Sequence, residues 1–144
     1  MIEIEKLAWA KTDGLLPAIV LDTDTGRVLL LGYLNRESLE QTLNCGFVTF
    51  WSRSRQCLWT KGETSGHSLT LSGISSDCDS DALLVRAKPK GPTCHRGTAS
   101  CFAADDKFSV LEFLARLEQL VLGRKATLPE GSYTTLLFQK GDQE

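Results

Sequence analysis

Short apolar segments alternate with polar and turn-forming residues over roughly the first hundred positions of the chain. This pattern is typical of strands, and it predicts them at residues 18–22, 28–33, 47–51, 57–61, 68–72 and 82–87. Asp24, Thr25 and Gly26 separate the first two segments and are favourable hairpin-turn residues. The pattern therefore predicts a β-rich region that opens with a hairpin.

Two other segments have helical signals. Asn35 is a favourable N-cap and Gly46 a favourable C-terminal stop, which predicts a short helix between them. A longer helix is predicted at about residues 110–122, where Ser109 and Glu112 have the spacing of a capping box. Strands before a long helix favour an α+β fold.

Length and composition add limits to this picture. The chain has 144 residues and 42% hydrophobic positions, which suits one globular domain. We expect a β-rich single domain at residues 1–108, followed by a helix and a linker-like tail at residues 109–144. The formal net charge of -2 gives no general attraction to nucleic acid or to an anionic membrane, and we expect neither partner. The first residues resemble neither a signal peptide nor a membrane span, so we expect a cytoplasmic protein.

An acidic run combines two kinds of metal ligand. Asp77, Asp79 and Asp81 alternate with Cys78 and Ser80. If the run is extended, its three carboxylates share one face and Cys78 lies on the other. Three adjacent carboxylates repel one another unless a cation neutralises them, and oxygen ligands suit Mg²⁺ or Ca²⁺ whereas thiolates suit Zn²⁺. The run therefore indicates two metals of different chemistry.

The acidic run has two simpler interpretations. A helix-loop-helix calcium site needs Gly at its sixth position and Glu at its twelfth, where this chain has Ala82 and Lys88. That interpretation is excluded. A solvated acidic turn without any ion remains open.

The five cysteines are odd in number, which does not suit a closed disulfide framework. Cys94 and Cys101 enclose a compact loop, and Cys78 from the same chain or from a partner could complete a trio. Three thiolates with one open position would form a catalytic zinc site. The loop lacks the cysteine spacing of zinc deaminases, and the isolated Cys45 and Cys57 are expected to be ordinary core residues.

His95 follows one of these cysteines directly. It could be a fourth ligand, an acid–base group or a polar loop residue, and the acid–base role is favoured because imidazole exchanges protons near neutral pH. His67 is expected to contact substrate or solvent.

A basic and aromatic segment at residues 51–66 is a candidate anion-binding surface, because guanidinium groups and hydroxyls suit phosphate oxygens. An exposed charged hairpin would have the same composition. Trp51 and Trp59 could be core anchors or platforms on which a base stacks. The candidate substrate-binding residues are Trp51, Ser52, Arg53, Arg55, Lys61 and Ser65.

Three segments together, FWSRSRQCLWTKGETSGH, SDCDSDALL and GPTCHRGTASCF, closely resemble the phosphoribosyl-AMP cyclohydrolase family over roughly residues 7–102. The resemblance implies hydrolytic opening of the N1–C6 bond in the adenine ring of N1-(5-phosphoribosyl)-AMP, a step of histidine biosynthesis. It also implies Zn²⁺ and Mg²⁺ as cofactors and an intertwined homodimer with zinc sites at its interface. A zinc-stabilised dimeric nucleotide-binding module without turnover is the alternative.

Carried over to this chain, the resemblance implies roles for individual residues. Cys78 of one subunit would hold zinc together with Cys94 and Cys101 of the other, and His95 would transfer protons. The carboxylates expected to hold magnesium are Asp77, Asp79 and Asp81.

The tail of the chain resembles a second family. Residues 117–139 are similar to the linker and opening of the phosphoribosyl-ATP pyrophosphohydrolase domain that is fused to this enzyme in bifunctional members. The acidic metal-binding helices of that domain do not follow residue 141, so we expect the chain not to catalyse the preceding pathway step.

Overall fold

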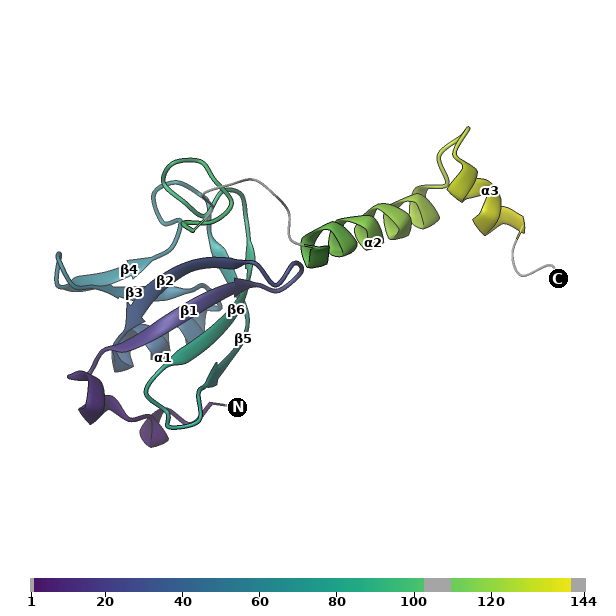
Figure 1. Ribbon diagram of the computed structural model, residues 1–144. Coiled ribbons are helices and arrows are strands. Elements are labelled where there is room, and N and C mark those ends of the chain that lie inside the picture. The colour runs from purple at the N-terminus through teal and green to yellow at the C-terminus, as the bar shows by residue number, and fades with distance from the viewer. Residues whose placement is uncertain (1, 103–109, 141–144) are drawn as a thin grey trace. The chain divides into compact units, whose positions relative to one another are not determined.

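The computed structural model describes residues 2–102 and 110–140 (Figure 1). The chain divides into two compact units, Met1–Asp106 and Lys107–Glu144, and each is described by itself. The boundary expected after residue 108 lies outside the described residues.

The first unit contains the strands of the described chain, arranged as one sheet and one hairpin. The four-stranded sheet has the order β2-β1-β6-β5, in which β1 and β6 are parallel and the other pairs antiparallel. β3 and β4 form a separate antiparallel hairpin. The predicted α+β class is confirmed. The elements are η1 (Ile4–Lys6), η2 (Trp9–Thr12), β1 (Leu16–Asp22), β2 (Val28–Leu34), α1 (Arg36–Cys45), β3 (Thr49–Ser52), β4 (Cys57–Thr60), β5 (Leu69–Ser76) and β6 (Leu83–Pro89).

The two faces of the four-stranded sheet differ in burial. Alternate residues of β1 and β6 point into the core, so Ala18 pairs with Leu83 and Val20 with Val85, all of them buried. On the opposite face Ile19 pairs with Leu31, and these side chains are 41% and 46% exposed. One face of the sheet is therefore packed, and the other presents apolar side chains that the described residues of the first unit leave partly exposed.

The predicted caps of α1 are confirmed. The Asn35 side chain accepts a hydrogen bond from the Ser38 amide, and the Ser38 hydroxyl accepts one from the Asn35 amide, both at 2.9 Å. Gly46 ends the helix in the left-handed conformation, with φ of 74°. Leu39 then packs in the core without exposed surface.

Gly32 allows β3 to approach β2. A Cβ atom at this position would lie 2.3 Å from the Phe50 ring, closer than any side chain could be. The ring of Phe50 is almost fully buried and lies 5.7 Å from the Trp59 ring, centroid to centroid. This contact anchors the β3–β4 hairpin to the main sheet and keeps Trp59 at the edge of the core.

The acidic run is not extended, so that part of the sequence prediction was wrong. β5 continues to Ser76, β6 begins at Leu83, and the residues between them form a turn in which Ser80 has a positive φ of 61°. The physical reason is the Asp77 side chain, whose Oδ1 accepts backbone hydrogen bonds from Asp81 at 3.0 Å and Ala82 at 3.2 Å. These local bonds replace the ladder that a strand would need.

The second unit contains the helices α2 (Val110–Thr127) and α3 (Tyr133–Lys140). The predicted long helix is confirmed, although it ends at Thr127 rather than near residue 122, while Ser109 of the expected capping box lies outside the described residues. The apolar residues at positions 136–138 belong to α3. No helix within residues 2–102 and 110–140 is long and apolar enough to span a membrane.

Candidate active site

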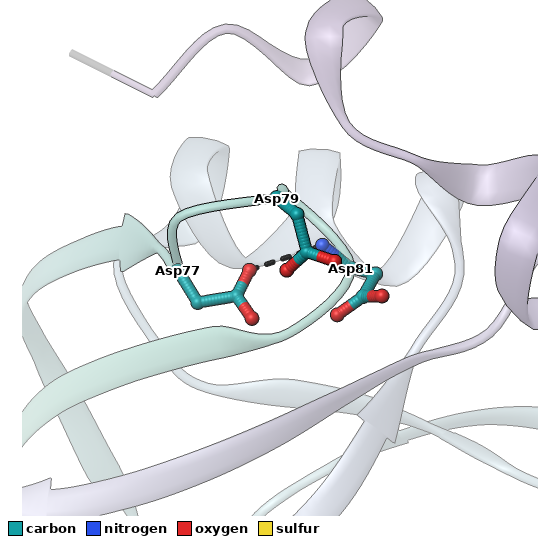
Figure 2. Close-up of side chains that lie close together, drawn as sticks. All are labelled: Asp77, Asp79 and Asp81. Carbon is teal, nitrogen blue, oxygen red and sulfur yellow. Dashed lines mark hydrogen bonds between the residues drawn. The ribbon is translucent and has the colours of Figure 1, made fainter.

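Three carboxylates gather in the β5–β6 turn. One oxygen from each of Asp77, Asp79 and Asp81 lies within 4.8 Å of the others, and this is the one such group of potential metal ligands in the described part of the chain (Figure 2). The sequence predicted that the three carboxylates would lie together, but the backbone conformation that brings them together differs from the predicted one. The turn brings the carboxylates together, whereas the prediction relied on alternation along a strand.

Two residues of the N-terminal segment, Ala8 and Lys11, contact this turn. The Ala8 amide donates a 2.8 Å hydrogen bond to the Ser80 carbonyl. Lys11, from η2, places its Nζ 2.7 Å from an Asp79 oxygen and 3.4 Å from an Asp81 oxygen. The hydrogen bond from Lys11 holds the pKa of Asp79 below its ordinary value, and the pKa of Lys11 is raised by the same bond. The ammonium group of Lys11 therefore neutralises part of the negative charge of this carboxylate cluster.

A cavity of about 600 Å³ lies at the other end of the first unit, large enough for a nucleotide-sized ligand. Its walls combine apolar, hydroxyl, imidazole and thiol groups. The lining residues are Leu30, Leu31, Trp59, Lys61, Gly62, Thr64, Ser65, His67, Pro92, Thr93, Cys94, His95, Gly97 and Cys101.

The structure brings Cys94 and Cys101 together in the wall of this cavity, as the sequence predicted. The loop is tied to β2, because the Cys101 amide donates to the Leu29 carbonyl at 2.8 Å and the Ser100 hydroxyl to the Val28 carbonyl at 2.6 Å. A backbone hydrogen bond at Arg96, followed by the side chains of Thr98 and Cys101, lowers the pKa of Cys94. Burial, followed by the hydrogen bond with Cys94, raises the pKa of Cys101. Cys94 is therefore the more acidic thiol of the pair.

Two histidines border the same cavity. His95 is exposed, and its Nδ1 lies 3.9 Å from the Cys94 sulfur. The His67 Nδ1 lies 3.3 Å from the Lys90 carbonyl, and a Cβ atom at Gly91 would come within 2.4 Å of that nitrogen. The His67 ring therefore packs directly against the Gly91 backbone, so this histidine, which the sequence left as a contact to substrate or solvent, is part of the cavity wall.

Cys78 does not join the other two cysteines within one chain. It lies in the β5–β6 turn, five residues before β6 begins, whereas Cys94 follows the end of β6 by five residues. A seven-residue strand spans roughly 20 Å, and Figure 1 shows the two loops at opposite ends of β6. Cys78 is also not one of the residues that line the cavity. The alternative in which one chain supplies all three thiols is thereby removed.

The predicted substrate-binding residues separate into two groups. Lys61 and Ser65 line the cavity, and the Lys61 ammonium donates to the His67 carbonyl at 3.3 Å. The others belong to β3 or to the β3–β4 turn and do not line it. Arg53 stacks on the Tyr33 ring at 3.8 Å, and Arg55 donates to the Ser52 hydroxyl at 3.4 Å. The residues outside the cavity are Trp51, Ser52, Arg53 and Arg55.

The sequence alone did not place Trp59 and Thr93 in the cavity wall. Trp59 was left open between core anchor and stacking platform, and it both packs against the core and lines the cavity. Thr93 received no role, although its position beside Cys94 was a usable signal. Both were difficult to place because cavity walls are built from segments distant in sequence.

The donor groups fit the two cations that the sequence predicts. Three carboxylates within reach of one another supply oxygen ligands for a hard divalent ion. The Cys94 and Cys101 sulfurs supply soft ligands, with one thiol already inclined to ionise. The fold and its site thus define an α+β protein with separate oxygen and sulfur donor sets, the latter beside a nucleotide-sized cavity.

Comparisons with known proteins connect this arrangement to one family. Residues 30–103 match phosphoribosyl-AMP cyclohydrolase. The curated "Histidine biosynthesis bifunctional protein HisIE" of Xylella fastidiosa strain Temecula1 is 54% identical over 140 residues, which cover 97% of this chain and 66% of that protein. The proteins of the same name from Photobacterium profundum and Escherichia coli K12 are 49% and 54% identical over 142 and 136 residues, covering 96% and 94% of this chain and 69% and 66% of their own lengths.

The chain belongs to the phosphoribosyl-AMP cyclohydrolase family, as its motifs predicted. The match to the bifunctional proteins continues past residue 103, where the family match ends, and this confirms the predicted likeness of the tail. The chain spans about two thirds of the length of the curated relatives it matches, 66% of the first of them.

Proposed function

We propose that this protein hydrolyses the N1–C6 bond of N1-(5-phosphoribosyl)-AMP, opening the adenine ring in a step of histidine biosynthesis. One observation carries the proposal. The segment that matches the family, residues 30–103, contains every residue that lines the cavity and both sets of metal donors. The family likeness and the chemistry of the site therefore concern the same part of the molecule.

In this proposal the Cys94 and Cys101 sulfurs hold zinc, which when bound supplies an activated water near neutral pH. His95 lies beside Cys94 at the cavity wall and transfers the proton that the purine N1 gains as the N1–C6 bond breaks. Trp59 offers an aromatic face to the purine, and Lys61 offers a buried cation to an anionic part of the substrate. The three aspartates hold magnesium, which offsets their mutual repulsion and favours the approach of a doubly phosphorylated substrate.

We also propose that the working unit is a homodimer in which Cys78 of one subunit completes the thiol site of the other. Two features support this assembly. Cys78 and the thiol pair lie at opposite ends of β6, so one chain cannot supply the trio. The open sheet face is apolar at Ile19 and Leu31, and Leu31 also belongs to the cavity wall. A second copy that covers this face would approach the cavity directly.

Turnover of phosphoribosyl-AMP tests the activity, followed as loss of adenine absorbance with zinc content measured per chain. We expect the wild type to be active and Cys94→Ala to lower turnover by more than about 1000-fold. The core position predicted for Cys45 and Cys57 was wrong, because both are exposed. Cys45→Ala is therefore the matched control, since Cys45 lies outside the cavity wall and its loss should leave turnover unchanged. A folded, zinc-loaded wild type that binds nucleotide without turnover would refute the enzyme and favour a nucleotide-binding module.

A further inference from the structure

Thr93 has a buried hydroxyl with no hydrogen-bond partner. The residue is 4% exposed, and its Oγ1 forms no hydrogen bond with any described residue. Thr42 in α1 provides the contrast. It is also fully buried, but its Oγ1 donates to the Ser38 carbonyl at 2.7 Å and accepts from the Thr49 amide at 2.9 Å. A buried hydroxyl without a partner is destabilising, so one at position 93 calls for an explanation beyond packing.

The position of Thr93 points to a ligand. Thr93 lines the same cavity as Lys61 and directly precedes Cys94. Lys61 is only 8% exposed, and its ammonium uses one of three donor hydrogens, toward the His67 carbonyl. In the described part of the chain no carboxylate forms an ion pair with it. The inner wall therefore contains two polar groups with unused hydrogen-bonding capacity.

Resting on the proposed function, we propose that the Thr93 hydroxyl hydrogen bonds with the purine base of the substrate and helps to determine specificity for it. The hydroxyls of Thr64 and Ser65 are exposed at the rim of the cavity and suit phosphate groups, which keep part of their hydration. Thr93 is enclosed and adjacent to the thiol pair, where the reacting end of the base must lie. Its hydroxyl can both donate and accept, and a rotation about χ1 exchanges it with the methyl group without moving the backbone.

The test compares Thr93→Val, Thr93→Ser and Thr42→Val. Each is assayed for kcat and KM with phosphoribosyl-AMP, for affinity toward adenosine monophosphate by calorimetry, and for Tm without ligand. We expect Thr93→Val to lower kcat/KM by about 10-fold to 100-fold and to weaken nucleotide binding, while Tm stays the same or rises. Thr93→Ser should recover most of kcat/KM. Thr42→Val should lower Tm and keep kcat/KM, because its hydroxyl has internal partners.

Two results would overturn the role of Thr93. In one, Thr93→Val keeps the wild-type kcat/KM and nucleotide affinity. In the other, Thr93→Val lowers Tm as much as Thr42→Val does and Thr93→Ser fails to rescue binding, which would make the hydroxyl structural. Failure of the proposed function is seen separately, as a wild type that does not turn over phosphoribosyl-AMP. The effect of Thr93→Val on nucleotide affinity then still decides whether the hydroxyl contacts the base.

Discussion

The two candidate metal sites of this protein are built in opposite ways. The acidic site takes its donors from one turn of five consecutive residues, and the Asp77 side chain fixes that turn through backbone hydrogen bonds. The thiol site takes two donors from a loop that is anchored on β2, while Cys78 lies at the far end of β6. In the proposed assembly the first site is complete within one chain, whereas the second takes Cys78 from a partner subunit.

The acidic turn can form when a single chain folds, whereas the proposed thiol site forms only when two chains assemble. Local hydrogen bonds can organise the carboxylates as soon as β5 and β6 pair, and Lys11 already neutralises part of their charge. The proposed shared thiol site, in contrast, would depend on how a second copy approaches the exposed face of the sheet. Metal binding at a shared site would contribute to the stability of the dimer, whereas metal binding at the acidic turn would act within each chain.

The largest expected effect comes from mixing two inactive variants. Cys78→Ala and Cys94→Ala should each abolish turnover when the subunits carry the same change. If the site is shared, a mixed dimer keeps one site with Cys78 from one subunit and both other cysteines from its partner. Unfolding and refolding the two variants together should then restore about a quarter of wild-type turnover, since about half of the dimers are mixed and each has one intact site.

The control for the mixing experiment is a chain that carries both Cys78→Ala and Cys94→Ala. Refolded with either single variant, the doubly changed chain cannot rebuild an intact site and should restore nothing. If the two single variants also remain inactive when refolded together, although mixed dimers are detected by mass spectrometry, the thiol site is not shared between subunits.

A smaller effect, on the free energy of unfolding, should distinguish Asp77 from Asp79 in the acidic turn. Asp77→Ala removes the acceptor of two backbone hydrogen bonds, so it should lower the free energy of unfolding by about 1 kcal/mol. Asp79→Ala removes an exposed ion pair with Lys11 and should leave stability nearly unchanged. Both variants should weaken magnesium binding. Urea unfolding and calorimetry measure the two effects, and equal loss of stability would contradict the special role of Asp77 in the turn.

Local features of the fold were readable in the sequence because they depend on neighbouring residues. The first hairpin and both caps of α1 were predicted from residues such as Asn35 and Gly46. The parallel pairing of β1 with β6 was not predicted, because it joins strands about sixty residues apart and no local pattern encodes it. The extended form of the acidic run was predicted wrongly because alternation was read without considering that an Asp side chain competes for backbone amides.

In the candidate site, too, the features encoded by neighbouring residues were predicted and those set by tertiary contacts were not. The carboxylate group and the Cys94–Cys101 pair were predicted from short sequence spacing, and the structure brings each together. The arginines at positions 53 and 55 were chosen by residue type, but the β3–β4 turn directs Arg53 to Tyr33 and Arg55 to Ser52 rather than to the cavity. Residue chemistry suggests what a side chain can bind, whereas tertiary contacts decide what it reaches.

The smallest expected effect concerns Lys11, whose ammonium lies where a magnesium ion would compete for the same oxygens. Lys11→Met removes this internal cation, so we expect magnesium affinity to rise about two- to fivefold, measured by calorimetry. Lys6→Met is the matched control, because Lys6 is also exposed and N-terminal but pairs with Glu3. A weaker affinity in Lys11→Met than in Lys6→Met would mean that the ammonium supports the metal site instead of competing for it.

The same pair predicts a dependence on pH. Lys11 lowers the pKa of Asp79 in the folded protein, so the stabilisation from this pair is present above the unfolded pKa of Asp, near 3.9. It is lost as the pH falls through the lower folded pKa, and Lys11→Met should shift the titration of Asp79 upward in carboxyl NMR spectra. An unchanged Asp79 titration would show that the ion pair is not formed in solution, and the acidic turn would then depend on magnesium alone for its neutralisation.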